Sequence, residues 1–256
     1  MATLRHGLQT RVFLDKYEMT DWLRNATKMS DRDIAEAPPF HAAAKVKKGG
    51  VVDEKMAFAG MFDGTAGAIA PVLDAILDAD DQHVLTLFPE DALDVTAGHL
   101  GRRAYLASIK EAKANVEAVS TEIVKVDAEM AADGRIVGGH SYHDSATALA
   151  AAGSGASPYI DMGASPASTA FGGIGHLHVF GTNTLSGSLT VIVQHSSDHV
   201  VWVDLVSFAV VGAGVEKVER LASTIATVLR YTRATWVAAA GTGQASFAVA
   251  FGRKTK

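Results

Sequence analysis

The spacing of hydrophobic residues changes near residue 63, and this change locates the best-defined elements of the chain. Residues 53–62 alternate, with Met56 and Phe58 on one face and small or polar residues on the other. A period of two predicts a half-buried strand. Asp63 and Gly64 then mark a sharp reversal, because glycine tolerates the backbone angles of a tight turn.

After this turn the apolar residues follow a helical period. They fall in one stripe at i, i+3, i+4, i+7 and i+8: Ile69, Val72, Leu73, Ile76 and Leu77. The helix is expected over about 66–78, with its regular part beginning near Pro71, since proline is accepted only in a first turn. Because the remaining patterns are strand-like, this single helix is expected to flank a sheet.

The segment before this strand is polar. Residues 15–37 carry scattered apolar side chains and are expected to form strands on an exposed sheet. The two prolines at 38–39 interrupt regular structure. Residues 41–52 follow as a long loop or a protruding hairpin, with exposed lysines and a tip at 49–50. A connection of this length in a compact domain is usually functional.

The second half of the chain divides into two compositions. Residues 146–170 are rich in Ala, Gly, Ser and Pro, which predicts a flexible linker. Several short alternating segments follow, and their turn residues at regular intervals predict a β-sandwich. The expected fold is therefore mainly β: a β-sandwich or barrel with one flanking helix over 1–145, the linker, and a C-terminal β-sandwich over 171–256.

Composition narrows the class of protein. With 48% hydrophobic and 20% charged residues, the 256-residue chain is globular and not disordered. It has no cysteine, which excludes disulfides and thiolate metal sites. Neither a signal peptide nor a membrane helix is evident, so we expect a protein that stays or assembles in a cytoplasm. Residues 1–145 carry 16 Lys and Arg against 23 Asp and Glu, which argues against wrapping nucleic acid.

Candidate catalytic motifs are few. The segment 62–65 (FDGT) resembles the metal-binding FDGHGG motif of the protein phosphatase 2C family, but Thr65 replaces the histidine and no second acidic motif follows. A strand-ending turn is the favoured interpretation. No nucleophile elbow, phosphate loop or dinucleotide fingerprint is present. We therefore expect no catalytic residue and no cofactor.

Two groups of histidines were weighed as metal ligands. His140 and His143, followed by Asp144, lack a further ligand at helical spacing. His176 and His178 share one face of an expected strand and need a third ligand. Solvated loop histidines are the favoured interpretation in the first case, and surface or core histidines in the second. No metal site is therefore expected.

Several N-terminal segments resemble the major tail protein, or tail tube subunit, of long-tailed bacteriophages, particularly those of actinobacteria. The matching segments are 7–14, 33–40, 46–55, 57–64 and 121–139. The C-terminal half is similar to an add-on β-sandwich of phage tail proteins. Its recurring motifs are QHS-x-D at 194–198, W-x-D-L at 202–205, R-Y-x-R-A-x-W at 230–236 and FAVAF at 247–251.

The resemblance implies a structural virion protein. Six copies would close into a ring, and stacked rings would form the tail tube, through which genomic DNA passes without specific binding. Asp31, Asp33 and Glu36 are expected to line the lumen. The expected ring-stacking loop contains Lys45, Lys47, Lys48, Gly49 and Gly50.

The same resemblance implies partners and a location. The partners are a tape measure protein and the tail terminator and baseplate proteins, with no membrane involved. The protein would be assembled in the host cytoplasm and would reside in the virion tail, with the C-terminal sandwich decorating the outside. Two alternatives stay open: a module that binds host-surface glycans on an oligomeric mount, with aromatic residues such as Trp202 and Tyr231 on its face, and a capsid decoration protein.

Overall fold

Most of the described residues form β-strands, which confirms the expected mainly-β fold. The computed structural model describes residues 10–37, 46–66, 68–78, 81–89, 103–118, 124–144, 149–150, 153–162, 169–181, 183–239 and 241–255. Within these ranges one helix is present, α1 (Ile69–Asp78). No helix in them is long and apolar enough to cross a membrane.

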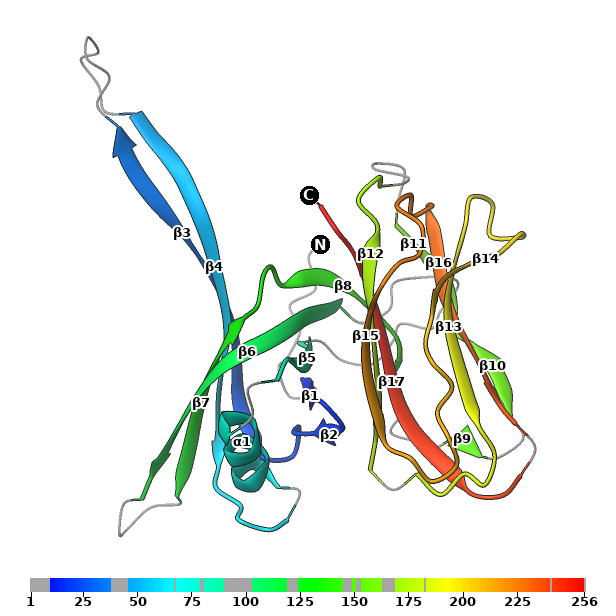
Figure 1. Ribbon diagram of the computed structural model, residues 1–256, viewed down its shortest axis with the longest axis horizontal. Coiled ribbons are helices and arrows are strands. Elements are labelled where there is room, and N and C mark those ends of the chain that lie inside the picture. Colours follow the sequence, from blue (N-terminus) through cyan, green and yellow to red (C-terminus); the bar gives the residue numbers. More distant parts are fainter. Residues whose placement is uncertain are drawn as a thin grey trace, which may run out of the picture. The chain divides into compact units, whose positions relative to one another are not determined.

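The strands are numbered in chain order (Figure 1). Those of the first half are β1 (Arg11–Leu14), β2 (Tyr17–Glu18), β3 (Leu23–Ala37), β4 (Val46–Met61), β5 (His83–Phe88), β6 (Arg103–Glu117), β7 (Lys125–Ala132) and β8 (Val137–Asp144). Those of the second half are β9 (Leu149–Ala150), β10 (Ser154–Ala156), β11 (Ile160–Asp161), β12 (Gly173–Phe180), β13 (Leu189–Ser196), β14 (Val203–Ser207), β15 (Lys217–Ala222), β16 (Tyr231–Ala238) and β17 (Gln244–Arg253).

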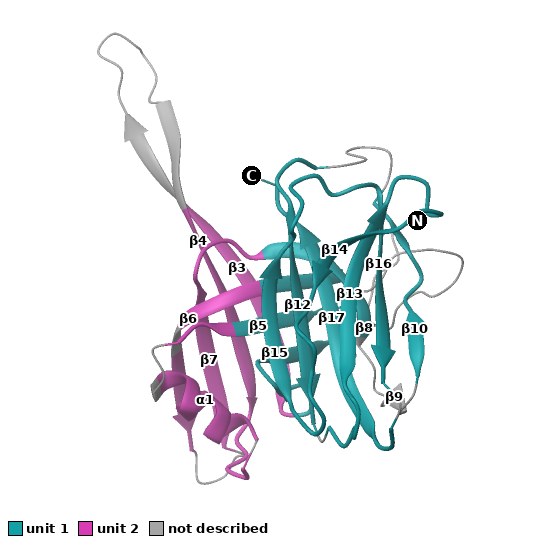
Figure 2. Cartoon of the chain, turned by 45° about the vertical axis from the view of Figure 1, so that its right-hand side comes forward, with its two compact units in different colours: residues 1–21, 84–106, 137–256 teal, residues 22–83, 107–136 magenta. Residues whose placement is uncertain are grey.

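The chain forms two compact units, coloured separately in Figure 2. Unit 1 comprises residues 1–21, 84–106 and 137–256, and unit 2 comprises residues 22–83 and 107–136. Each unit therefore combines segments that are far apart in the sequence, and β6 contributes residues to both.

Unit 2 is built on an antiparallel sheet with the strand order β3-β4-β7-β6. β3 and β4 pair along nearly their whole length, from Leu23 opposite Gly60 to Ala37 opposite Val46. They form the long hairpin of Figure 1. The expected strands in the polar segment are thus confirmed. Of the two alternatives for residues 41–52, a long loop or a protruding hairpin, the described residues from 46 onward form a hairpin.

The helix begins slightly earlier than expected, at Ile69 and not near Pro71. Pro71 is the third helical residue, where a missing amide hydrogen costs little because first-turn amides have no intrahelical acceptor. The preceding turn is fixed by Asp63, whose carboxylate accepts the Thr65 amide at 2.8 Å. Of the five residues in the expected stripe, four are buried and Leu77 is 44% exposed. In both views α1 lies beside the sheet (Figures 1 and 2).

Unit 1 contains the expected β-sandwich. One sheet has the order β15-β12-β17-β8 and the other β10-β16-β13-β14. The core between them includes Leu177 of β12 and Phe247 of β17. A second cluster combines Ile174 and Ala248 of the same two strands with Phe13 of β1. β12 and β17 are therefore buried on both faces, and unit 1 has a third layer that the sequence did not predict.

Part of the expected linker forms strands. β9 pairs with β17, and β10 and β11 pair with β16. At Gly155 of β10 a Cβ atom would come within 2.8 Å of the Trp236 ring, so glycine permits this close approach. Small residues that suggested flexibility thus allow edge pairing here. The expected division at residues 145 and 171 stays a prediction.

Candidate assembly surface

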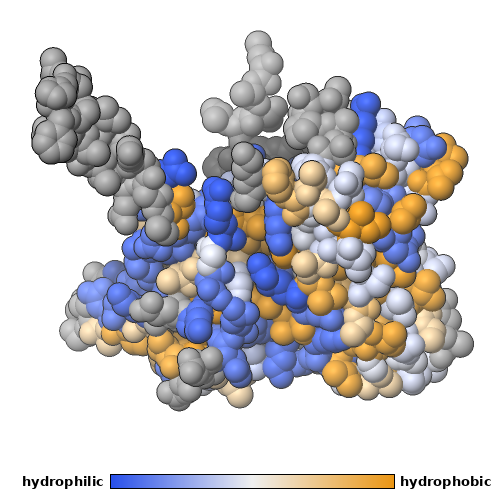
Figure 3. Space-filling model, turned by 45° about the horizontal axis from the view of Figure 1, so that its top comes forward, coloured by the Kyte–Doolittle hydropathy of each residue, from blue (hydrophilic) through white to orange (hydrophobic). Residues whose placement is uncertain are grey.

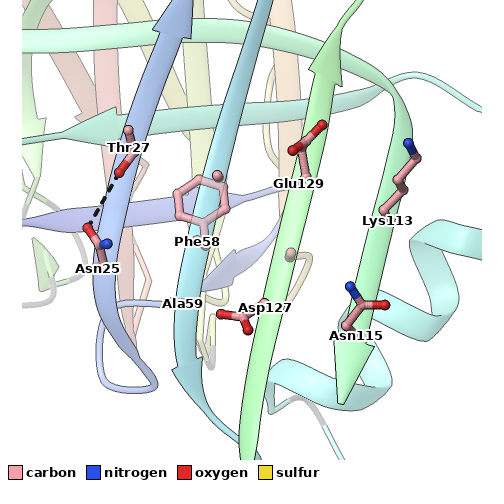
Figure 4. Close-up of a pocket in the computed structure, with 10 residues that line it drawn as sticks. Asn25, Thr27, Phe58, Ala59, Lys113, Asn115, Asp127 and Glu129 are labelled. Carbon is pink, nitrogen blue, oxygen red and sulfur yellow. Dashed lines mark hydrogen bonds between the residues drawn. The ribbon is translucent and has the colours of Figure 1, made fainter. Parts of the chain in front are cut away.

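The sheet of unit 2 has an apolar face and a polar face, because side chains alternate along its strands. The buried hydrophobic side chains of β4 and β7 are Met56, Phe58, Val126, Ala128 and Met130. The register aligns the opposite face in rows across four strands. One row is Asn25, Ala59, Asp127 and Asn115, and the next is Thr27, Ala57, Glu129 and Lys113 (Figure 4).

This polar face carries an excess of acidic groups. Its described charged side chains are Asp31, Asp53, Glu117, Asp127 and Glu129 against Lys55, Lys113 and Lys125. Lys55 Nζ lies 2.9 Å from a carboxylate oxygen of Glu129. This hydrogen bond raises the pKa of Lys55 and lowers the pKa of Glu129. Because the pair is exposed, it neutralises two charges without adding much stability, and the remaining charge stays negative.

A shallow groove of about 280 Å³ lies on this face (Figure 4). Its lining consists of Asn25, Thr27, Ala57, Phe58, Ala59, Lys113, Asn115, Asp127, Ala128 and Glu129. Small-molecule sites are usually concave, with hydrophobic walls and volumes of roughly 300–1,000 Å³. The groove is smaller, and six of its ten lining residues are polar, so it belongs to the polar face and does not define a ligand pocket.

The apolar face contains one buried carboxylate, Glu54, which is 4% exposed. It accepts hydrogen bonds from Lys28 Nζ at 3.2 Å, from Ser30 Oγ at 2.9 Å and from the Ile136 amide. Burial alone would raise the pKa of Glu54, but these three donors lower it below its usual value. Glu54 therefore stays ionised and ties β4 to β3 and to the end of the β7–β8 connection.

The residues expected to line a lumen lie on β3. Asp31 is exposed and pairs in register with Asp53. Asp33 and Glu36 lie farther along the same strand, where Glu36 pairs with Lys47. That these residues line a lumen stays a prediction. The acidic residues of β7 were missed, although the alternation within 125–130 was a usable signal.

The expected ring-stacking loop is only partly described. Lys47, Lys48, Gly49 and Gly50 belong to β4, and Gly49 pairs with Ile34 of β3. The two glycines are therefore in a paired strand and do not form the tip of the hairpin, which corrects that expectation. Lys45 lies outside the described residues.

The sheet of unit 2 has one long edge strand, β3. Among the described residues, β3 pairs only with β4. At the other end of the order, β6 pairs with β7 over residues 109–117 and also with β8 and β5. An end strand of 15 residues leaves amide and carbonyl groups available for pairing with another chain.

The FDGT segment forms the strand-ending turn that the sequence favoured. The Trp22 indole Nε1 donates to an Asp63 carboxylate oxygen at 3.1 Å. Hydrogen bonds from Thr65, and then from Trp22, lower the pKa of Asp63. Asp63 is thus engaged in shaping the turn. No group of three or more His, Asp or Glu residues in the described part of the chain is placed to hold a metal ion.

The histidines considered as ligands have structural contacts. His143 stacks on Phe247 with ring centroids 3.9 Å apart and lies 2.8 Å from the Phe247 carbonyl oxygen through Nδ1. His176 and His178 share one face of β12, as expected, and both contact Thr86.

No family model matches the chain, and no curated protein matches it. Among solved structures, it is similar to the SPP1 tail tube, with a TM-score of 0.39 and 10% identity over 52% of this chain and 78% of that chain. A chain of the native gene transfer agent virion has a TM-score of 0.38 and 14% identity, covering 52% of this chain and 97% of that chain. A chain of the sheath-tube complex of an extracellular contractile injection system in its extended state has a TM-score of 0.37 and 14% identity, covering 53% of this chain and 90% of that chain.

Proposed function

We propose that the chain is a tail tube subunit whose copies close into six-membered rings and stack into a conduit for DNA. The observation that carries this proposal is the sheet of unit 2, which has one polar face and a long edge strand, β3. The resemblance of the sequence to tail tube subunits supports the same function.

The number of strands suits ring closure. Neighbouring strands in the order β3-β4-β7-β6 are antiparallel, so β3 and β6 run in opposite directions. If copies are related by rotation about an axis roughly along the strands, β3 of one copy runs antiparallel to β6 of the next and would pair along the part of β6 that β5 does not occupy. Repeated around a ring, this pairing would satisfy edge groups that a lone chain leaves to water.

The polar face is the proposed lining of the lumen. Its acidic excess would repel DNA phosphates over a screening length of about 10 Å, so that DNA slides without specific binding. Asp31, Asp33 and Glu36 would extend this lining along β3. The far end of the hairpin, with Lys47 and Lys48, would contact the next ring. Tape measure, terminator and baseplate proteins, and assembly in a host cytoplasm, belong to the same proposal.

Glycan binding is a second candidate, and an aromatic cluster of unit 1 favours it. The rings of Tyr159, His199 and Tyr231 lie with centroids 5.1–5.5 Å apart. Nearby in the sequence, Val200 and Val201 are 74% and 66% exposed. Hydrophobic patches also appear among polar residues on the face seen in Figure 3. Exposed apolar groups of this kind often mark binding surfaces.

Negative-stain electron microscopy of the purified full chain tests these functions. Six-fold rings or tubes are expected for a tail tube subunit, and trimers would instead indicate a capsid decoration protein. Monomers at all concentrations, together with binding of the full chain to a glycan array, would overturn the tube proposal in favour of glycan binding. Light scattering on the same samples measures the copy number independently.

A further inference from the structure

A network of buried hydrogen-bonded side chains lies in the interior of unit 1. Thr86 of β5 and His176 of β12 are 0% exposed, and His178 of β12 is 1% exposed. Thr86 Oγ1 lies 2.8 Å from His176 Nδ1 and 2.8 Å from His178 Nε2. His178 Nδ1 lies 2.6 Å from the carbonyl oxygen of Asp15, in the turn between β1 and β2. This network therefore joins three segments that are distant in the sequence.

The carbonyl at one end fixes the direction of every hydrogen bond. Because a carbonyl only accepts, His178 Nδ1 carries the proton, and Nε2 of the neutral ring is then an acceptor. The Thr86 hydroxyl must donate its single hydrogen to His178 Nε2, so His176 donates from Nδ1 to Thr86. His176 Nε2 is left as a bare acceptor, and it has no hydrogen-bond partner among the described residues.

We propose that Thr86, His176 and His178 form an acid-sensitive latch that holds β1 and β5 against β12 only while both imidazoles are neutral. One added proton has to enter at His176 Nε2, where it creates a buried cation whose N–H lacks a described acceptor. A second added proton directs two N–H groups at the Thr86 oxygen and leaves the hydroxyl hydrogen without an acceptor. This inference goes beyond the proposed tube and does not depend on it.

The surroundings of the latch are buried and largely apolar, with two charged groups nearby. Its charged neighbours among the described residues are Asp15 on the β1–β2 turn and Arg220 of β15, which pairs with His176. β17 contributes Ala248 and Ala250 to this layer, and β1 contributes the ring of Phe13, 5.6 Å from His178.

These surroundings shift both histidine pKa values downward. Burial, followed by the charges of His178 and Arg220, lowers the pKa of His176 well below its usual value. Burial also lowers the pKa of His178 to about 4, although the Asp15 carbonyl acts in the opposite direction.

The direction and size of the effect follow from proton linkage. An opened segment exposes histidines with a pKa of about 6.5, so the opened state binds more protons and the latch weakens as pH falls below that value. Between pH 7.5 and pH 5, each histidine should increase the opening equilibrium about 30-fold. Together the two should increase it on the order of 1,000-fold. For His178 the increase in the opening equilibrium levels off near pH 4, because the ring then also takes up a proton in the latched state.

Site-resolved hydrogen exchange of the full chain tests the latch. Exchange of β1 and β5 amides, corrected for intrinsic rates, is measured from pH 7.5 to pH 5. The substitution His176→Asn keeps a donor near the Nδ1 position and cannot ionise, so the pH-dependent increase should fall to about 30-fold. Thr86→Val removes the central hydroxyl and should raise opening already at pH 7.5.

A matched control is His199→Asn, because His199 is exposed and asparagine tolerates its positive φ of 54°. This variant should keep the wild-type pH profile. His195 of β13 is reported separately by amides of β13 and β16, so its titration is not confused with the latch. A wild-type profile without pH dependence at β1 and β5, or one that His176→Asn leaves unchanged, would overturn the proposal.

Discussion

The most direct test of unit 2 is the replacement of its buried carboxylate, Glu54→Gln. The substitution keeps the shape of the side chain but removes its charge and replaces one acceptor oxygen with an NH₂ group. Three donors meet Glu54, namely Lys28, Ser30 and the Ile136 amide. A glutamine oxygen can satisfy only part of this set, and its NH₂ group must face one of the donors.

The expected cost follows from these contacts. Hydrogen bonds to a charged group contribute roughly 1.5–3 kcal/mol each, and breaking a fully buried pair costs roughly 3–5 kcal/mol. The Lys28 side chain is 23% exposed, so water can partly replace the lost carboxylate. We therefore expect a loss of about 2–3 kcal/mol in the free energy of unfolding of unit 2, or roughly 30- to 150-fold more frequent opening.

Hydrogen exchange of β4 and β7 peptides measures this opening locally, with unit 1 peptides as an internal reference. Glu129→Gln is the matched control, because the same chemical change at this exposed position should leave exchange nearly unchanged. The difference between wild type and Glu54→Gln should shrink as pH falls below about 4.5, since the lowered pKa of Glu54 contributes stability only while it is ionised. Equal effects of the two substitutions would refute this account of Glu54.

Two further predictions concern the core of unit 1 and the proposed lumen. The Tyr142 hydroxyl is buried 2.7 Å from Thr232 Oγ1, so Thr232→Val should cost about 1–3 kcal/mol in thermal unfolding. Adding Tyr142→Phe should recover most of this loss, and no recovery would contradict the pairing. The combined substitutions Asp31→Lys, Asp33→Lys and Glu36→Lys should slow DNA ejection from particles while tubes still assemble. The same number of reversals on the sandwich serves as control, and unchanged infectivity would count against a lumen-lining role.

Helices and strands were predicted best where one face of the element is buried and the other is not. The alternation around Met56 and Phe58 and the helical stripe from Ile69 correspond to β4 and α1. Only the start of the helix was misplaced, because the proline rule excludes Pro71 from the helix interior but does not choose among the first three positions. The partly buried alternation of β7 is equally readable, but no sequence motif marks its acidic residues as part of a functional surface.

Features that depend on contacts between distant segments could not be read from the sequence. Residues 154–156 look like linker because their composition is small and polar, and only the neighbouring Trp236 ring explains the glycine among them. The expected tip at Gly49 and Gly50 failed for a related reason: glycine signals a turn locally, but the register of β3 carries both residues within a strand.

The two-sided burial of β12 and β17 changes how the C-terminal sandwich should be tested. In the sequence, Phe247 to Phe251 alternates with alanine, which is typical of a strand with one exposed face. In the structure Ala248 and Ala250 pack against the layer of β1 and β5, and β8 pairs with β17. A fragment that begins near residue 170 would lose those partners and expose this apolar face and the latch histidines to water. We therefore expect such a fragment to fold poorly. A failure of the fragment to bind glycans would then reflect misfolding, so glycan binding has to be tested with the full chain.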